Sequence, residues 1–96
     1  ALSDRAKIAN EAQASYFVSV HYNSAPSKDA HGIEVFYYRS ESDLKRTNAS
    51  KAFAEEVLGQ VINMSKAKSR GVKSGNFAVI RETNMPAILV EGGFLT

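Results

Sequence analysis

Met85-Pro86-Ala87-Ile88-Leu89-Val90-Glu91-Gly92-Gly93 is the stretch that decides the fold of this 96-residue chain. Its apolar residues, 87–90, are bounded by a proline on one side and by a glutamate and two glycines on the other. A continuous apolar run of this length is typical of a strand buried on both faces beneath helices. Glu91 follows the run directly, at the carboxyl end of the predicted strand, where open α/β sheets place their ligands. The alternative is that Glu91 is a solvated residue at a strand end.

A second predicted strand, over residues 16–20, ends in a similar way. It is rich in aromatic and β-branched residues, and His21 follows it. If the two strands run parallel in one sheet, His21 and Glu91 emerge at the same edge. Imidazole and carboxylate are what zinc-dependent hydrolysis requires, the first as a metal ligand and the second as a general base. A lone histidine after a strand is more often a structural or surface residue than a metal ligand.

Two helices are predicted. The first covers residues 1–14, with Ser3 as its N-cap, and its small side chains would let it lie close on a sheet: Ala6, Ala9 and Ala12. The second runs from a turn at residues 39–42, which offers the N-cap, to about Met64. Its expected buried stripe consists of two rows at i, i+4 spacing: Phe53, Val57 and Val61, and Ala54, Leu58 and Ile62.

Two further strands are expected, over residues 33–38 and 77–80, with Glu34 facing solvent near a sheet edge. Residues 65–75 are expected to form a polar, basic connector. This connector lacks the glycine spacing of a phosphate-binding loop and the interleaved aromatic residues that stack on bases. The order of elements predicts an α/β fold with a mostly parallel, twisted sheet flanked by helices.

Composition narrows the classes of protein. Hydrophobic residues make up 44% of the chain and charged residues 23%, which is ordinary for a soluble globular domain. The net charge of +2 permits an anionic partner but does not argue for nucleic acid. The absence of cysteine excludes disulfides and thiolate metal sites. No apolar run approaches the roughly 18–20 residues that a membrane span needs.

Three stretches become specific when they are taken together. They are Val18-Ser19-Val20-His21-Tyr22-Asn23-Ser24-Ala25, then Gly32-Ile33-Glu34-Val35-Phe36-Tyr37-Tyr38, then Arg70-Gly71-Val72-Lys73 followed by Met85 to Leu95. In this order they closely resemble the zinc-dependent N-acetylmuramoyl-L-alanine amidases of the amidase-3 type, which cut bacterial cell-wall peptidoglycan. Arg5 and Ala9-Asn10 also match the segment that precedes the His-bearing strand in that family. The resemblance therefore covers essentially all 96 residues.

The resemblance assigns roles to two residues. His21 matches one of the family's zinc (Zn2+) ligands, and Glu91 matches its catalytic glutamate, a general acid/base. The family's other two ligands, a His in a Gly-His-Gly-Gly-like turn and a Glu on the following helix, have no counterpart in residues 1–96. The chain is thus expected to be a partial amidase catalytic domain that lacks its N-terminal segment. His31, in a variable loop position, is expected to lie at the surface instead of binding metal.

The activity that the resemblance implies is hydrolysis of the amide bond between N-acetylmuramic acid and L-alanine of the stem peptide, with peptidoglycan as the partner. Lys73 and Arg81 could attract the anionic stem peptide or could simply be solvated. The rival interpretation is a non-catalytic, metal-free module that binds the cell wall. The expected place of action is extracellular or in the cell wall, in a secreted, periplasmic or phage-delivered enzyme. Neither nucleic acid nor a membrane span is expected.

The absent ligands lead to an expectation about the chain by itself. Catalytic zinc is held by three protein ligands with a fourth position open, and His21 supplies one. The absent segment is also expected to supply a central strand of the sheet. The 96-residue chain alone is therefore expected to be inactive, to bind zinc weakly, and to associate through an apolar sheet edge and part of the Phe53–Val57–Val61 stripe unless another segment covers them.

Overall fold

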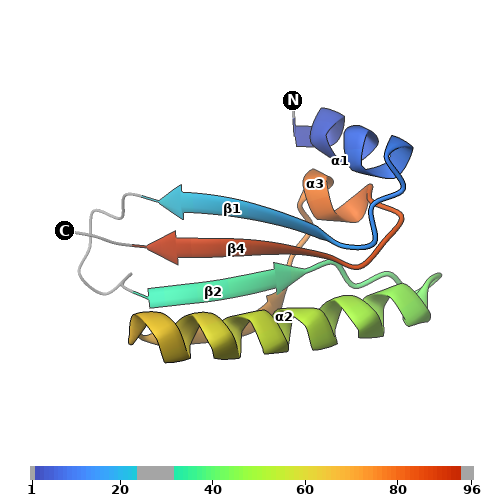
Figure 1. The fold of residues 1–96 in the computed structure, drawn as a ribbon. Helices are drawn as coiled ribbons and strands as arrows, with labels where there is room; N and C mark the ends of the chain where they lie inside the picture. Colours follow the sequence, from blue (N-terminus) through green and yellow to red (C-terminus); the bar gives the residue numbers. More distant parts are fainter. Residues whose placement is uncertain (1, 24–31, 94–96) are drawn as a thin grey trace.

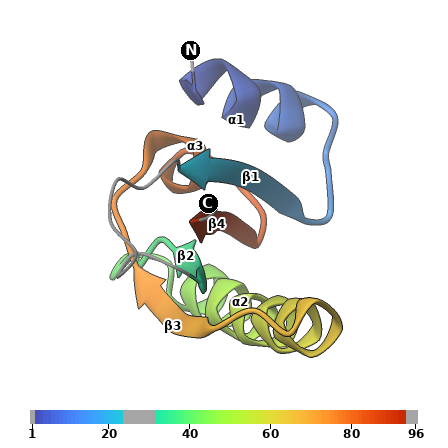
Figure 2. The ribbon, with the colours of Figure 1, turned by 90° about the vertical axis from the view of Figure 1, so that its left-hand side faces the viewer.

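A computed structural model describes residues 2–23 and 32–93 of the chain. It contains a four-stranded sheet in the order β1-β4-β2-β3, with helices on both faces (Figures 1 and 2). The elements, in chain order, are α1 (Leu2–Glu11), β1 (Phe17–Asn23), β2 (Gly32–Tyr37), α2 (Leu44–Ser65), β3 (Ser69–Ser74), α3 (Ala78–Arg81) and β4 (Ala87–Gly93). The predicted α/β layer fold is confirmed.

The sheet is mostly parallel, as the sequence predicted. β1 runs parallel to β4, and β2 runs parallel to β3. The two pairs are joined by the antiparallel pairing of β2 with β4, so one of the three pairings departs from the parallel rule. β4, formed by the apolar run at 87–90 and its continuation, lies inside the sheet between β1 and β2.

One face of the sheet is covered by α2. The core on this side consists of buried Val35 and Ile88 from the sheet and Ala54 and Leu58 from the helix. The predicted stripe is confirmed, because Phe53, Val57 and Ile62 also pack against this core. The N-cap is not in the predicted turn at 39–42 but directly after it, since Asp43 caps the helix by accepting a hydrogen bond from the Arg46 backbone N–H at 3.0 Å.

The opposite face is covered by α3, where the sequence predicted a strand over residues 77–80. That prediction was wrong. Val79 and Ile80 are almost fully buried and pack against Ala87 and Leu89 of β4. A short apolar run is compatible with a buried strand and with a buried helical turn alike, and periodicity cannot separate the two. Figure 2 shows α2 and α3 on opposite sides of the sheet.

α1 packs against α3. The prediction that this helix lies directly on the sheet was therefore wrong. Ala6 and Ala9 are buried on its inner face, whereas Ala12 is exposed. The helix begins at Leu2, so Ser3 lies within its first turn and not before it. Asn10 fastens the helix to the loop after α3, because its amide donates to the Glu82 carbonyl at 2.8 Å and accepts from the Asn84 backbone N–H at 2.7 Å.

β3 lies where the sequence predicted a basic connector, and that prediction was also wrong. Residues 69–74 pair with β2 and form an outer strand of the sheet. Gly32 starts β2 with a φ of +121°, and a Cβ there would lie 2.6 Å from the Lys68 carbonyl oxygen. Only glycine fits this conformation and this close approach of two backbones without strain.

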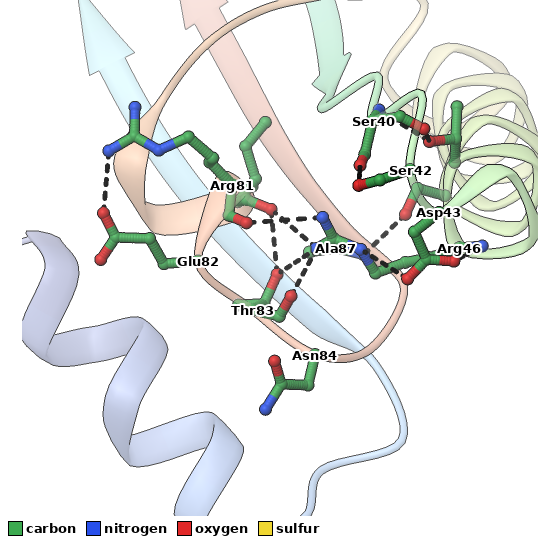
Figure 3. A network of polar contacts seen from close by, with 12 residues as sticks. Ser40, Ser42, Asp43, Arg46, Arg81, Glu82, Thr83, Asn84 and Ala87 are labelled. Atoms are coloured by element: carbon green, nitrogen blue, oxygen red, sulfur yellow. Dashed lines mark hydrogen bonds and ion pairs between the residues drawn. The ribbon is translucent and has the colours of Figure 1, made fainter.

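Arg46 ties the start of α2 to the segment between α3 and β4 (Figure 3). Its guanidinium donates to the carbonyl oxygens of Ile80, Arg81 and Thr83. Ser50, one turn further along α2, accepts the Ala87 backbone N–H at 3.1 Å. The entry to β4 is therefore fixed by side chains of α2, which sets the position of the residues that follow in this strand.

Candidate active site

His21 and Glu91 are direct neighbours on adjacent parallel strands. His21 of β1 pairs in register with Glu91 of β4, near the carboxyl ends of both strands (Figure 1). Both residues lie within their strands and not just after them, because β1 extends to Asn23 and β4 to Gly93. Paired residues in a sheet point to the same face. The predicted meeting of the two side chains at one edge of the sheet is confirmed.

Both side chains line a pocket of about 490 Å3 on the α3 side of the sheet. The lining residues come from α1, three strands and the α3 region: Arg5, Ser19, Val20, His21, Phe36, Phe77, Val79, Leu89 and Glu91. His21 is exposed and Glu91 is partly buried. A concave site with a mainly apolar lining and a few convergent polar groups is what small-molecule and substrate sites have in common.

The floor of the pocket is apolar. Phe36 of β2 and Phe77 meet edge to face, with ring centroids 5.1 Å apart. Leu89 precedes Glu91 by two residues and therefore points to the same face of β4. Sequence reasoning missed the aromatic floor, because Phe77 was assigned to a strand and Phe36 carried no polar signal. The pairing of two aromatic residues from distant segments becomes visible only in the fold.

Glu34 lies on the other side of Glu91. The antiparallel register of β2 and β4 pairs Glu34 with Glu91, so a row of His21, Glu91 and Glu34 crosses three strands. The expectation that Glu34 faces solvent near an edge was wrong, because β2 is an interior strand and the Glu34 side chain is 17% exposed. Lys73 of β3 donates to the Glu34 carboxylate at 2.7 Å.

The cationic side chains near the site have different surroundings. Arg5 lines the pocket from α1, which fits its place in the matched segment. Arg81 donates to the Asn76 side-chain oxygen at 2.9 Å and to the Glu82 carboxylate at 2.8 Å, and it does not line the pocket. The two cations predicted as possible attractors of substrate thus differ, because Lys73 reaches the row beside Glu91 whereas Arg81 is held by its own neighbours.

A complete zinc site does not form within the part of the chain that the structure describes. In residues 2–23 and 32–93, no three His, Cys, Asp or Glu side chains come together as metal ligands would. His21 is suited to supply one nitrogen ligand, and Glu91 beside it is the neighbouring carboxylate. His31, the alternative ligand, lies outside the described residues. The described donors therefore fit one position of a zinc site and leave at least two to other residues.

The outer side of β1 is apolar and accessible. Val18 is 46% exposed and Val20 is 54% exposed, and β1 has no neighbour on this side in the described sheet. A shallow groove of about 340 Å3 runs between this strand and α1. Tyr16, 60% exposed, continues the apolar surface toward Phe53 of α2, with ring centroids 4.8 Å apart. The apolar edge matches the expectation from the sequence, whereas the three stripe residues expected to be partly exposed are partly buried: Phe53, Val57 and Val61.

Comparison with known proteins now decides the family. The sequence profile described as N-acetylmuramoyl-L-alanine amidase matches residues 1–96. The chain belongs to this amidase family. An N-acetylmuramoyl-L-alanine amidase from Clostridium difficile, whose crystal structure is known, has 40% sequence identity with this chain. The two structures superpose with a TM-score of 0.84, over 98% of this chain and 48% of that one. The fold of this amidase chain is therefore that of its structural relatives.

Curated relatives give the same picture. The N-acetylmuramoyl-L-alanine amidase LytC of Bacillus subtilis is 35% identical over 99% of this chain and 18% of its own length. The endolysin of Bacillus phage SPP1 is 36% identical over 98% of this chain and 34% of its own length. The amidase chain thus spans about half of the solved structure and between 18% and 34% of these two relatives. No helix among the described residues is long and apolar enough to cross a membrane.

Proposed function

We propose that this amidase chain forms part of a peptidoglycan hydrolase that cleaves the amide bond between N-acetylmuramic acid and the L-alanine of the stem peptide. The observation that carries the proposal is the register pairing of His21 with Glu91 above a substrate-sized pocket. The sequence identity of this chain with an amidase, 35% over 99% of the chain, supports the same reaction. A carboxylate beside a nitrogen ligand, at the carboxyl ends of parallel strands, is suited to hydrolysis.

In this proposal Glu91 is the general acid/base. It takes a proton from the water that adds to the carbonyl carbon, which forms the C–O bond. It then delivers this proton to the amide nitrogen, so that the C–N bond breaks and the amine leaves. The products are a lactyl carboxylic acid on the sugar and a free L-alanine amine. Zinc, when bound, would supply a Lewis acid that polarises the scissile carbonyl. His21 would contribute one ligand, and residues beyond the described chain would contribute the others.

We also propose that residues 1–96 are one part of a larger amidase domain, whose other part pairs with β1. The accessible apolar edge formed by Val18 and Val20 supports this arrangement, because such an edge is normally covered in a folded domain. The share of the solved amidase that the chain spans, 48%, agrees with it. The expected place of action is the cell wall, reached by secretion, in the periplasm or by phage delivery, because relatives include a cell-wall amidase and an endolysin.

The test uses a complete amidase domain that contains residues 1–96. Glu91→Gln should leave zinc bound and lower hydrolysis of peptidoglycan by roughly 10²- to 10⁴-fold, the usual contribution of a general acid/base. His21→Ala should instead lower the zinc content, measured by mass spectrometry of the purified protein. Glu56→Gln, an exposed position on α2, is the matched control and should change neither quantity.

The rival function is a metal-free module that binds the cell wall. It predicts that wild type, Glu91→Gln and His21→Ala all contain no zinc and all bind insoluble peptidoglycan equally. Unchanged hydrolysis in Glu91→Gln would contradict the acid/base role of Glu91 and make it a structural residue.

A further inference from the structure

A cluster of two cations and a carboxylate lies next to the candidate active site and has no part in the proposed reaction. Lys73 Nζ lies 2.7 Å from Glu34 Oε2, and Arg70 Nε lies 3.9 Å from the same oxygen. The three side chains differ in exposure: 17% for Glu34, 32% for Arg70 and 48% for Lys73. The carboxylate is therefore the inner member, and the two cations surround it toward solvent.

The sheet register places this cluster on the same face as the pocket. Lys73 pairs with Phe36, whose ring lines the pocket floor, and Glu34 pairs with Glu91. From Glu91, the row passes to Glu34 and then to the backbone of Gly71 on β3. Neighbouring strands lie roughly 4.8 Å apart, so β3 is roughly 10 Å from β4. Two extended residues of a bound stem peptide would span about 7 Å of this distance, and a peptide side chain would span the remainder between Glu91 and the cluster.

Lys73 keeps binding capacity after its contact with Glu34 is made. An ammonium group has three N–H donors, and within residues 2–23 and 32–93 Lys73 donates only to Glu34. The half-exposed side chain therefore keeps donors for water or a ligand. The cluster carries two positive charges and one negative charge. An exposed ion pair adds little to stability, so folding alone gives a weak reason for two cations at this place.

We propose that Lys73 and Arg70 bind a carboxylate of the stem peptide, on the side of the scissile amide that carries the peptide, and that Glu34 holds Lys73 in position. This inference rests on the proposed function. It assigns substrate specificity to the cluster: the enzyme prefers a stem peptide with a free carboxylate about two residues beyond the scissile bond over one in which that group is amidated. Arg81 has no such role, because Asn76 and Glu82 engage it.

The experiment compares two synthetic muramyl peptides that differ only in this group, carboxylate or carboxamide. Equilibrium binding is measured in the complete domain carrying Glu91→Gln, so that the peptides are not hydrolysed during the measurement. The carboxylate form should bind roughly tenfold more tightly at low salt, and the preference should shrink as salt is raised, because the contact is ionic and partly exposed. This comparison needs no substitution in the cluster.

Two variants then locate the preference. Lys73→Gln combined with Arg70→Gln should bind both peptides equally, at the affinity of the amidated form. Lys73→Arg, which keeps the charge, should retain most of the preference. Lys45→Gln, an exposed position on α2, is the control and should leave the preference unchanged. Thermal unfolding of each variant checks that the fold is intact.

Equal binding of the two peptides by the unaltered cluster would overturn the proposal, and so would a preference that persists in the double variant. These outcomes are separate from failure of the proposed function. If the wild-type domain hydrolyses both peptides with equal KM, the amidase function stands and the carboxylate site fails. If neither peptide is hydrolysed but the preference is present, the carboxylate site stands and the amidase function fails.

Discussion

β1 and β3 are the two outer strands of the described sheet, and their side chains differ in kind. β3 carries Arg70 and Lys73 and has Gly71 at a φ of +89°, beside a register shift opposite β2. Charged residues and irregular backbone are what natural sheets use to stop further strands from adding. β1 instead exposes Val18 and Val20 along a regular strand. The β3 edge has the features of an edge that stays uncovered, whereas the apolar exposure of β1 agrees with the proposal that another segment pairs with it.

The difference between the β1 and β3 edges indicates where the proposed function requires another segment of the domain. The candidate catalytic pair lies on the β1 side of the sheet, next to the uncovered edge, and the proposed carboxylate site lies on the β3 side, where the sheet is finished. A segment that covers β1 would at the same time approach His21. The zinc ligands that the described residues do not supply are therefore expected on the segment that pairs with β1.

The largest effect is expected from charge placed on the β1 edge. Val18→Lys combined with Val20→Lys should prevent the remaining part of an amidase domain from docking, because an unpaired buried charge is very unfavourable. Mixing residues 1–96 with that part, as two chains, should then give at least about 100-fold less hydrolysis than the wild-type mixture, since a loss of about 3 kcal/mol in docking corresponds to this factor. The measurement is release of soluble peptide from cell walls.

The matched control places the same charges on the other edge. Ser69→Lys combined with Ser74→Lys on β3 should leave reconstituted hydrolysis unchanged, because both positions are exposed. If the β3 variant abolished hydrolysis and the β1 variant did not, the two edges would have been assigned the wrong way round.

A smaller effect is expected on the β3 side, at Gly32. Gly32→Ala should lower the free energy of unfolding by roughly 1–3 kcal/mol, because the left-handed backbone and the contact with the Lys68 carbonyl are both strained by a Cβ. Denaturant titration of the complete domain measures this change. Gly59 on α2 has open space around it, so Gly59→Ala should stabilise the domain by roughly 0.5–1 kcal/mol. Similar destabilisation by both variants would contradict the account of Gly32.

The smallest effect on folding is expected from Val18→Thr combined with Val20→Thr. Both side chains are about half exposed in the chain by itself, so its free energy of unfolding should change by roughly 0.5 kcal/mol or less. Self-association of the isolated chain should nevertheless decrease, because the apolar edge is what would drive it. Sedimentation velocity at several concentrations measures this. Undiminished association would place the contact surface elsewhere.

The sequence predicted the parts of the fold whose signal is local and strong. The apolar run at 87–90 marked a buried strand, and α2 was recognised from its i, i+4 rows. The meeting of His21 and Glu91 followed from two strand ends of like direction. Residues 77–80 were misassigned because four apolar residues carry no period that separates a helical turn from a strand. β3 was missed because an outer strand with charged side chains lacks the apolar pattern that marks a buried one.

The candidate site was predictable only in its polar members. His21 and Glu91 are residue types that carry chemistry, and each follows an apolar run. The pocket floor depends on Phe36 and Phe77, which are far apart in the sequence and meet where the residue that precedes α3 packs against β2. The contact between Glu34 and Lys73 depends on a register that no local pattern specifies. Long-range pairing, and not residue type, decides these parts.

The position of β4 also has a consequence for the order of events during synthesis. This strand follows all the others along the chain, yet it lies between β1 and β2 and joins the two parallel pairs. While a ribosome is still translating residues before 87, β1 has no partner among the described strands, and His21 has no carboxylate at its side. The nascent polypeptide can form the β2–β3 pair beneath α2, but it cannot assemble the His21–Glu91 pair. The proposed hydrolysis depends on that pair, so it cannot begin until β4 has been translated and has paired with β1.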